Sequence, residues 1–189
     1  MGSSSEYGTI KSPQKESSKC RPGSIYGQSK LSSSLYLVKM YKNKNFPAVV
    51  LRLYQSYGPK QDLNRFIPIV INGCLKNIKF SCSEGKQYRD FLHVGDVVQA
   101  IINSLKKKAA IGQIINIGTG SPKKIKNLVE TIKKISKGGF PQYGKIKLRK
   151  DEILKIYPNI NKAKRILGWN PKIKFKTGLS QTVKSFKND

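Results

Sequence analysis

Two short apolar runs, AVVLRL at residues 48–53 and QIINI at residues 113–117, place the strongest limit on what this chain can fold into. Both are rich in β-branched residues, and the first lies between Pro47 and an SYGP turn at residues 56–59. Strands without polar alternation are typical of parallel sheets that are covered on both faces. Because amphipathic segments of helical period lie between and around the runs, the pattern predicts an α/β fold with a parallel sheet.

The same periodicity predicts the other elements. Residues 1–23 are rich in Ser, Gly, Lys and Pro and are predicted to be loop. Residues 79–82 and 86–91 are predicted to form a short strand pair. Ser24 is placed to cap the first predicted helix, and Pro122 fits the first position of the fourth. The predicted helices span residues 24–41, 64–75, 94–105, 122–135, 161–167 and 177–186.

The composition limits the function classes. The chain has 189 residues, of which 38% are hydrophobic, so it can bury a core despite a formal charge of +27. Of its 37 basic residues only six are Arg, and the Lys residues are scattered over the predicted solvent faces of every element. This scatter favours solvated surfaces over a nucleic-acid interface, which would need a second signal. Attraction of a small anionic substrate remains the other interpretation.

Cysteine usage and hydropathy exclude several kinds of site. Cys20, Cys74 and Cys82 are odd in number, lack CxxC spacing and accompany a single His93, so neither a disulfide framework nor a metal site is expected. No apolar run approaches the ~18 residues that span a bilayer. The segment MGSSSEYG also lacks the basic and apolar parts of a secretion signal, so we expect a cytoplasmic protein.

A tyrosine and a lysine stand four residues apart at the start of the first predicted helix. Tyr26 and Lys30 form a YxxxK pattern, which places a phenol and an ammonium on one helix face. The ammonium favours the phenolate, so the pair can act as a general acid and base near neutral pH. In isolation this spacing is common on ordinary amphipathic helices, so the surrounding motifs must decide whether the pair is functional.

Six motifs accompany YxxxK in a fixed order. They are SSSEYG at 3–8, LRLYQSYGP at 51–59, RFIP at 65–68, YRDFLHVGDVVQAI at 88–101, INIGTG at 115–120 and KAKRILGWNP at 162–171. With this order the chain resembles the extended short-chain dehydrogenase/reductase superfamily, in its branch of NAD(P)-dependent nucleotide-sugar epimerases, dehydratases and reductases. The resemblance covers nearly the whole chain from Gly2 onward.

The resemblance implies roles for the residues around YxxxK. Tyr26 would exchange a proton with a sugar hydroxyl while NAD or NADP accepts or returns a hydride. Lys30 would hold the nicotinamide ribose and lower the Tyr26 pKa. Ser4 is the expected hydrogen-bond partner of the reacting oxygen, with Ser3 and Ser5 as neighbouring alternatives in the same run. Glu6 falls where dehydratases of the family place an acid for elimination, although other members also carry Glu there.

The later motifs imply a site for a nucleotide-diphosphate sugar. Arg89 and Arg149 match the two arginines that grip the diphosphate, a task that suits the guanidinium fork. Gln55 stands where the family usually has Asn, next to the substrate. His93 and Asp96 have structural interpretations that we favour, a packed imidazole and a helix cap. Gly118 and Gly120, in the fifth motif, are interpreted as turn glycines, and Trp169 in the sixth as a packing residue.

One family feature is missing from the sequence. No glycine-rich loop of the GxxGxxG type follows a predicted strand, although such a loop binds the cofactor pyrophosphate in the family. We therefore expect the C-terminal part of a Rossmann-type sheet, at residues 1–60 and 94–120, with a small α/β substrate-binding lobe at 61–93 and 121–189. NAD(P) binding by this chain alone is then doubtful. The chain would be a fragment, the product of an interrupted gene or half of a split enzyme with a separate N-terminal half, and a homodimer is another possible assembly.

Two functions follow as alternatives. The first is the catalytic and substrate-binding portion of an NAD(P)-dependent nucleotide-sugar epimerase, dehydratase or reductase that supplies polysaccharide biosynthesis. The second is an inactive truncated remnant that binds nucleotide sugar without catalysis. The shared motifs do not distinguish among the three reactions, and they identify neither the nucleotide nor the sugar of the substrate. Neither a nucleic acid nor a membrane is an expected partner.

Overall fold

The computed structural model describes residues 1–149 and 151–187. Its helices are the short η1 (Ser4–Glu6) and η2 (Lys108–Ala110), and α1 (Ile25–Lys44), α2 (Phe66–Leu75), α3 (Val94–Lys106), α4 (Ile125–Ser136), α5 (Asn161–Leu167) and α6 (Phe175–Ser185). Its strands are β1 (Gly2–Ser3), β2 (Val50–Leu53), β3 (Gln55–Tyr57), β4 (Lys79–Ser81), β5 (Tyr88–Arg89), β6 (Phe91–His93), β7 (Ile114–Ile117), β8 (Lys123–Lys124), β9 (Phe140–Gln142) and β10 (Lys155–Ile156).

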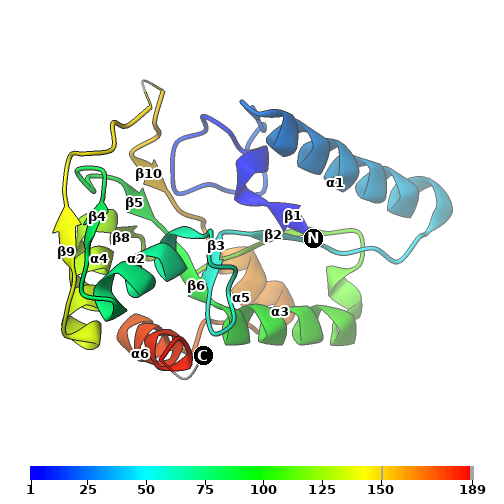
Figure 1. Ribbon diagram of the computed structural model, residues 1–189. Coiled ribbons are helices and arrows are strands. Elements are labelled where there is room, and N and C mark those ends of the chain that lie inside the picture. Colours follow the sequence, from blue (N-terminus) through cyan, green and yellow to red (C-terminus); the bar gives the residue numbers. More distant parts are fainter. Residues whose placement is uncertain (150, 188–189) are drawn as a thin grey trace.

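The two apolar runs form the centre of a parallel sheet. Its strand order is β1-β2-β7, with Val50 opposite Ile114 and Gly2 opposite Arg52. Helix α1 lies on one side of this sheet, and α3 and α5 lie on the other (Figure 1). The predicted α/β fold with a parallel sheet is therefore confirmed, and the cause is the one inferred from sequence, because helices cover both faces of the strands.

Helix α1 rests on the sheet through small residues. Ser24 caps it by accepting a hydrogen bond from the Gly27 N–H at 3.1 Å, as the sequence predicted. Gly27 and Ser34 are its only buried residues. A Cβ at Gly27 would lie 2.6 Å from the Ser5 carbonyl oxygen, so only glycine allows the helix start to approach η1 this closely.

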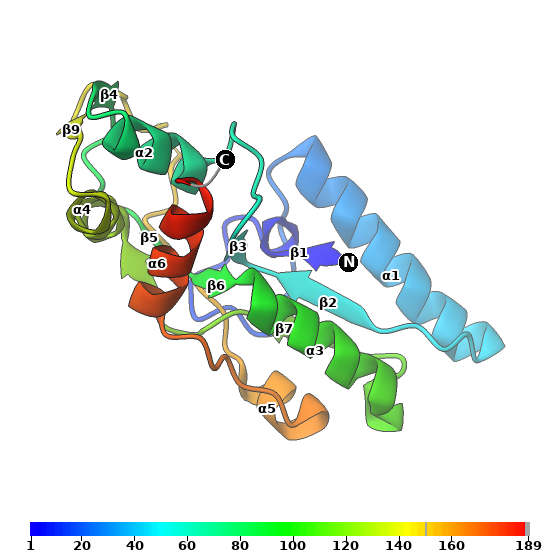
Figure 2. The ribbon, with the colours of Figure 1, turned by 60° about the horizontal axis from the view of Figure 1, so that its bottom comes forward.

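Two clusters of buried side chains hold the rest together. One lies between the β2–β7 sheet, α3 and α5, and it includes the indole of Trp169, whose Nε1–H donates to the Asp96 carbonyl oxygen at 3.0 Å. The Asp96 carboxylate accepts from the backbone N–H groups of Lys172 and Ile173, each at 3.0 Å. The other cluster lies among α2, α4 and α6, which pack together in Figure 2. Trp169 is a packing residue as predicted, whereas Asp96 anchors the tail and does not cap α3.

Three local predictions differ from the structure. Strand β4 pairs with β9, while β5 pairs with β10 and β8, so residues 79–82 and 86–91 do not pair with each other. Pro122 precedes strand β8, and α4 starts only at Ile125. The segment 1–23, predicted as loop, contains β1 and η1. In each case pairing with a distant strand decides the local structure.

The predicted division into two lobes stays a prediction, because the buried clusters follow it only in part. Ala163 and Leu167 of α5 belong to the cluster around the central sheet, although the division assigns residues 121–189 to the other lobe. Within the described residues, no helix combines the length and the apolar character that crossing a membrane requires.

Candidate active site

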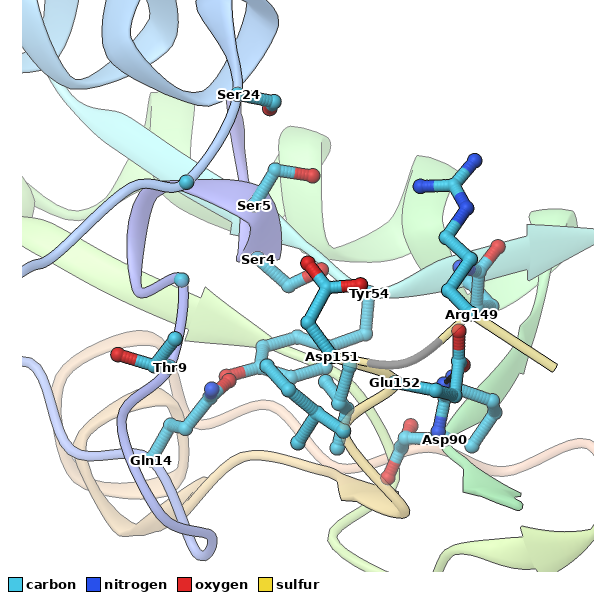
Figure 3. Close-up of a pocket in the computed structure, with 16 residues that line it drawn as sticks. Ser4, Ser5, Thr9, Gln14, Ser24, Tyr54, Asp90, Arg149, Asp151 and Glu152 are labelled. Carbon is cyan, nitrogen blue, oxygen red and sulfur yellow. Dashed lines mark hydrogen bonds and ion pairs between the residues drawn. The ribbon is translucent and has the colours of Figure 1, made fainter. Parts of the chain in front are cut away.

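A cavity of about 260 Å³ lies where the central strands end at their carboxyl side. The turn η1 follows β1 at this edge, and Tyr54 and Gln55 follow β2. Figure 3 shows the side chains that surround the cavity. The lining residues are Ser4, Ser5, Gly8, Thr9, Gln14, Gly23, Ser24, Tyr54, Gln55, Arg89, Asp90, Arg149, Asp151, Glu152, Ile153 and Ile156.

Four of the predicted site residues share this cavity. Ser4, Gln55, Arg89 and Arg149 all line it, although they are far apart in the sequence. Ser5, named as an alternative to Ser4, lines it too. The hydroxyl oxygen of the third serine, Ser3, instead caps η1 by accepting from the Ser5 N–H at 3.2 Å. The structure thus brings the predicted hydroxyl and both predicted diphosphate ligands to one place.

Arg89 is mostly buried and held in a fixed direction. Its Nη1 donates to the Tyr88 carbonyl oxygen at 2.9 Å, and its Nη2 forms an ion pair with Glu152. Burial lowers the pKa of Arg89, although the nearby Glu152 carboxylate acts to raise it. Arg149, in contrast, is exposed at the cavity edge. An anionic ligand would therefore meet one guanidinium that is held in place and one that is exposed to solvent.

Asp90 fixes the turn beside the cavity. Its two carboxylate oxygens accept from the Thr119 N–H at 2.7 Å and the Thr119 hydroxyl at 2.8 Å. The carboxylate is 1% exposed, and burial raises its pKa. Gly120 follows with a φ of +70°, which supports the prediction of a turn glycine in this motif.

The Tyr26–Lys30 pair lies outside the lining of this cavity, near the start of α1. The Lys30 ammonium is 5.8 Å from the centroid of the Tyr26 ring and also donates to the Met1 carbonyl oxygen at 3.3 Å. Tyr26 is 56% exposed, so its hydroxyl is accessible. Ser24, two residues earlier, does line the cavity. The start of α1 therefore places a phenol and an ammonium together beside the hydroxyls of η1.

Glu6 does not reach the cavity. Glu6 is the last residue of η1 and is 0% exposed; its Oε2 accepts from Arg52 Nε at 2.7 Å and its Oε1 accepts from the Ser3 N–H at 2.8 Å. The Arg52 guanidinium also lies over the ring of Tyr7, 4.7 Å from its centroid. A carboxylate engaged in this way cannot contact a sugar in the cavity, so the geometry does not fit the predicted role of an eliminating acid.

A buried hydrogen-bond network that the sequence did not reveal adjoins the cavity through Gln14 and Tyr54. The Tyr54 hydroxyl donates to Gln14 Oε1 at 2.7 Å, and the Asn116 amide donates to the Gln14 carbonyl oxygen at 3.0 Å. The Tyr7 hydroxyl in turn donates to Asn116 Oδ1 at 2.8 Å, and burial raises the pKa of Tyr7 to about 12. These contacts tie the loop before α1 to the ends of β2 and β7.

His93 has the structural role that was favoured for it. Its Nδ1 accepts from the Gly95 N–H at 3.1 Å and so caps α3, and its ring packs edge-on against Tyr57 at 5.5 Å between centroids. Burial lowers the pKa of His93. His93 is not among the residues that line the cavity.

A second cavity of about 360 Å³ adjoins the first through shared residues. Arg89, Arg149 and Glu152 line both. The other walls of the second cavity are mostly apolar, with Phe66 and Phe80 as their aromatic members. The pair of cavities therefore offers an apolar space, two guanidinium groups and a hydroxyl-lined space in succession.

Known proteins resemble this chain over most of its length. Residues 1–182 match the family model of GDP-mannose 4,6 dehydratase. A putative UDP-glucose 4-epimerase of Methanocaldococcus jannaschii is 35% identical over 182 residues, which are 94% of this chain and 58% of that protein. The CDP-abequose synthase of Salmonella muenchen is 29% identical, over 84% of this chain and 56% of that protein.

Solved structures show the same fold. The UDP-glucose 4-epimerase of Thermotoga maritima with UDP-glucose superposes with a TM-score of 0.91 at 30% identity, over 99% of this chain and 62% of that one. The dTDP-glucose 4,6-dehydratase of Bacillus anthracis in complex with NAD gives a TM-score of 0.89 at 27% identity, over 100% of this chain and 60% of that one. The chain therefore spans about three fifths of the length of these relatives.

Proposed function

Since this chain belongs to the GDP-mannose 4,6-dehydratase family of nucleotide-sugar epimerases and dehydratases, we propose that it carries the catalytic and substrate-binding part of an NAD(P)-dependent nucleotide-sugar-modifying enzyme. One observation carries the proposal. Two guanidinium groups and a serine hydroxyl share a cavity at the carboxyl ends of the parallel strands, and this cavity is also lined by Ser24, which caps the helix that carries Tyr26 and Lys30. A diphosphate and an oxidisable sugar hydroxyl are the groups that this arrangement suits.

The proposed chemistry begins at a sugar hydroxyl. Tyr26, as phenolate, takes the hydroxyl proton, while Ser4 donates a hydrogen bond to the same oxygen. The Lys30 ammonium lies close to this side chain, 5.8 Å from the centroid of its ring. A bound nicotinamide would supply the acceptor for the hydride that leaves the same carbon. In the reverse direction Tyr26 returns the proton to the carbonyl oxygen.

The residues that would hold the cofactor lie on α1. Lys30 and Tyr26 are placed beside the edge strand β1, where a nicotinamide ribose could accept a hydrogen bond from Lys30 and donate one to Tyr26. This fits the ribose end of NAD(P), and relatives of the same fold were solved with NAD. We assign residues 1–60 and 94–120 to this cofactor side of the site, and residues 61–93 and 121–189 to the nucleotide sugar.

The two cavities fit the parts of a nucleotide sugar in order. The diphosphate would lie at Arg89 and Arg149, which both cavities share. The base would enter the apolar cavity beside Phe66 and Phe80, because flat rings bury well against aromatic walls. The sugar would then extend toward Ser4 and the Tyr26 hydroxyl.

The diphosphate assignment predicts a loss of affinity in Arg89→Ala. Because a charge-assisted hydrogen bond to a diphosphate contributes about 1.5 to 3 kcal/mol, the dissociation constant for UDP-glucose should rise at least tenfold. Titration calorimetry measures the change, with circular dichroism to verify the fold. Lys86→Ala, which removes the same charge from an exposed position three residues earlier, is the matched control. Equal affinities of Arg89→Ala and wild type would contradict the assignment.

The cofactor assignment predicts weak binding of NAD(P) by this chain alone. Its sequence holds no glycine-rich loop for the pyrophosphate, which leaves Tyr26 and Lys30 with the ribose contacts only. Calorimetric titration with NAD and NADP should give no saturation at micromolar concentrations, while UDP-glucose still binds. A micromolar dissociation constant for either dinucleotide would show that the chain has another cofactor site.

A further inference from the structure

The cavity at the strand ends contains more acidic than basic side chains. Among the described lining residues Arg89 and Arg149 are the basic ones, whereas Asp90, Asp151 and Glu152 are acidic. A site that merely attracted anions would be expected to show the opposite balance, above all in a chain with a formal charge of +27. The acidic residues therefore need an explanation.

Two of the three carboxylates are engaged in holding the site. Asp90 accepts two hydrogen bonds from Thr119, and Glu152 is paired with Arg89. The pairing with Glu152 also means that part of the positive charge of Arg89 is already compensated before any ligand arrives. The cavity thus has little positive charge beyond what a diphosphate needs.

Asp151 differs from the other two because it is exposed to the cavity. Figure 3 shows its carboxylate pointing toward Ser4 and Ser5 of η1, with which it lines the same space. This is the side on which the reacting sugar would lie, away from the apolar cavity that would take the base. Asp151 is absent from the lining of that second cavity, whereas Arg149 and Glu152 belong to both.

A carboxylate on the sugar would meet an unfavourable environment here. It would share a small space with Asp151, and like charges a few Å apart repel strongly even at intermediate dielectric. Both basic residues of the described lining would face the diphosphate instead. Salt screens the charges of lysines that lie more than about 8 Å from the cavity at physiological ionic strength.

We propose that Asp151 restricts this site to nucleotide sugars whose sugar carries no carboxylate, that is, to neutral or amino-bearing sugars and not to uronates. The proposal rests on the proposed function, in which the cavity binds the sugar of a nucleotide sugar. It adds a specificity-determining residue that acts by repulsion, in addition to the residues that attract the diphosphate.

The test compares two ligands that differ only in the sugar carboxylate. Dissociation constants of the complete chain for UDP-glucose and UDP-glucuronic acid are measured by calorimetry at equal pH and 0.15 M salt. The wild type should bind UDP-glucose at least about tenfold more tightly. In Asp151→Asn the ratio of the two constants should fall below about threefold. Glu84→Gln, which removes an equal charge from an exposed position outside both cavities, should leave the ratio unchanged.

The outcomes separate the two proposals. Equal affinity of the wild type for both ligands, or a ratio that Asp151→Asn leaves intact, would overturn the role of Asp151 while the nucleotide-sugar site stands. If Glu84→Gln lowers the ratio of the two dissociation constants as much as Asp151→Asn does, the role of Asp151 is also overturned, because the effect then comes from the net charge of the protein. Failure to bind either ligand or UDP itself would refute the nucleotide-sugar site, and the specificity with it.

Discussion

Turnover should fall by about 10²- to 10⁴-fold when Tyr26 is replaced by Phe, the range expected for loss of general acid/base assistance. The substitution removes one oxygen from a side chain that is 56% exposed, so it leaves the packing of α1 almost untouched. Any loss can then be assigned to proton transfer. Because this chain lacks the glycine-rich loop, the assay needs an enzyme completed with that portion, as a co-expressed partner or a fusion.

Companion variants separate the proposed roles. Lys30→Met should also be severe, because it removes both the ribose contact and the ammonium that lies 5.8 Å from the Tyr26 ring. Ser4→Ala should be milder, since it removes one hydrogen bond. Tyr36→Phe, at a tyrosine of the same helix that is 62% exposed, is the matched control and should retain full turnover. If Tyr26→Phe keeps more than about a tenth of wild-type turnover, Tyr26 is not the acid/base.

Replacement of Glu6 by Ala should lower the free energy of unfolding by about 3 to 5 kcal/mol, the range for breaking one side of a buried ion pair. Glu6 and Arg52 are 0% and 2% exposed, and the substitution would leave the Arg52 guanidinium buried without its carboxylate. Urea unfolding followed by circular dichroism measures the change. Glu84→Ala breaks the exposed pair with Lys86 and should cost at most about 1 kcal/mol.

A double variant keeps this test informative if Glu6→Ala fails to fold. Glu6→Val combined with Arg52→Met replaces both charges by apolar groups, which is often neutral for stability at buried ion pairs. It should fold and restore most of the lost stability. A Glu6→Ala protein as stable as wild type would show that the pair contributes nothing, and would reopen the role of Glu6.

The sequence was most informative where burial alone decides the structure. The runs at 48–53 and 113–117 could be assigned to a parallel sheet because they are apolar on both faces, and β2 and β7 confirm it. The start of helix α1 was predictable because Ser24 supplies a capping hydroxyl. The lining residues Gln55, Arg89 and Arg149 were predictable only through the family motifs, since nothing in their local spacing joins them.

Tertiary contacts determine the features of the fold and the site that could not be predicted from the sequence. Strand β9 contains Pro141 and has no alternating pattern, so its pairing with β4 was not readable. The direction of Glu6 depends on how the short turn η1 sits over Arg52, a residue 46 positions away. Asp151 and Glu152 follow Arg149 closely in the sequence, but a charged run of this kind is most often a solvated surface. Their place in the cavity emerged only from the path of the chain.

The parallel pairing of the central sheet also has a consequence for folding kinetics. Gly2 pairs with Arg52, and Val50 pairs with Ile114, so each pairing must close a loop of fifty residues or more. Such non-local contacts form slowly, after helices that need only neighbouring residues. The cavity draws Ser4, Gln55 and Arg149 together across these same pairings. We therefore expect binding competence to be acquired late in folding, so that ligand binding reports complete folding where helix content does not.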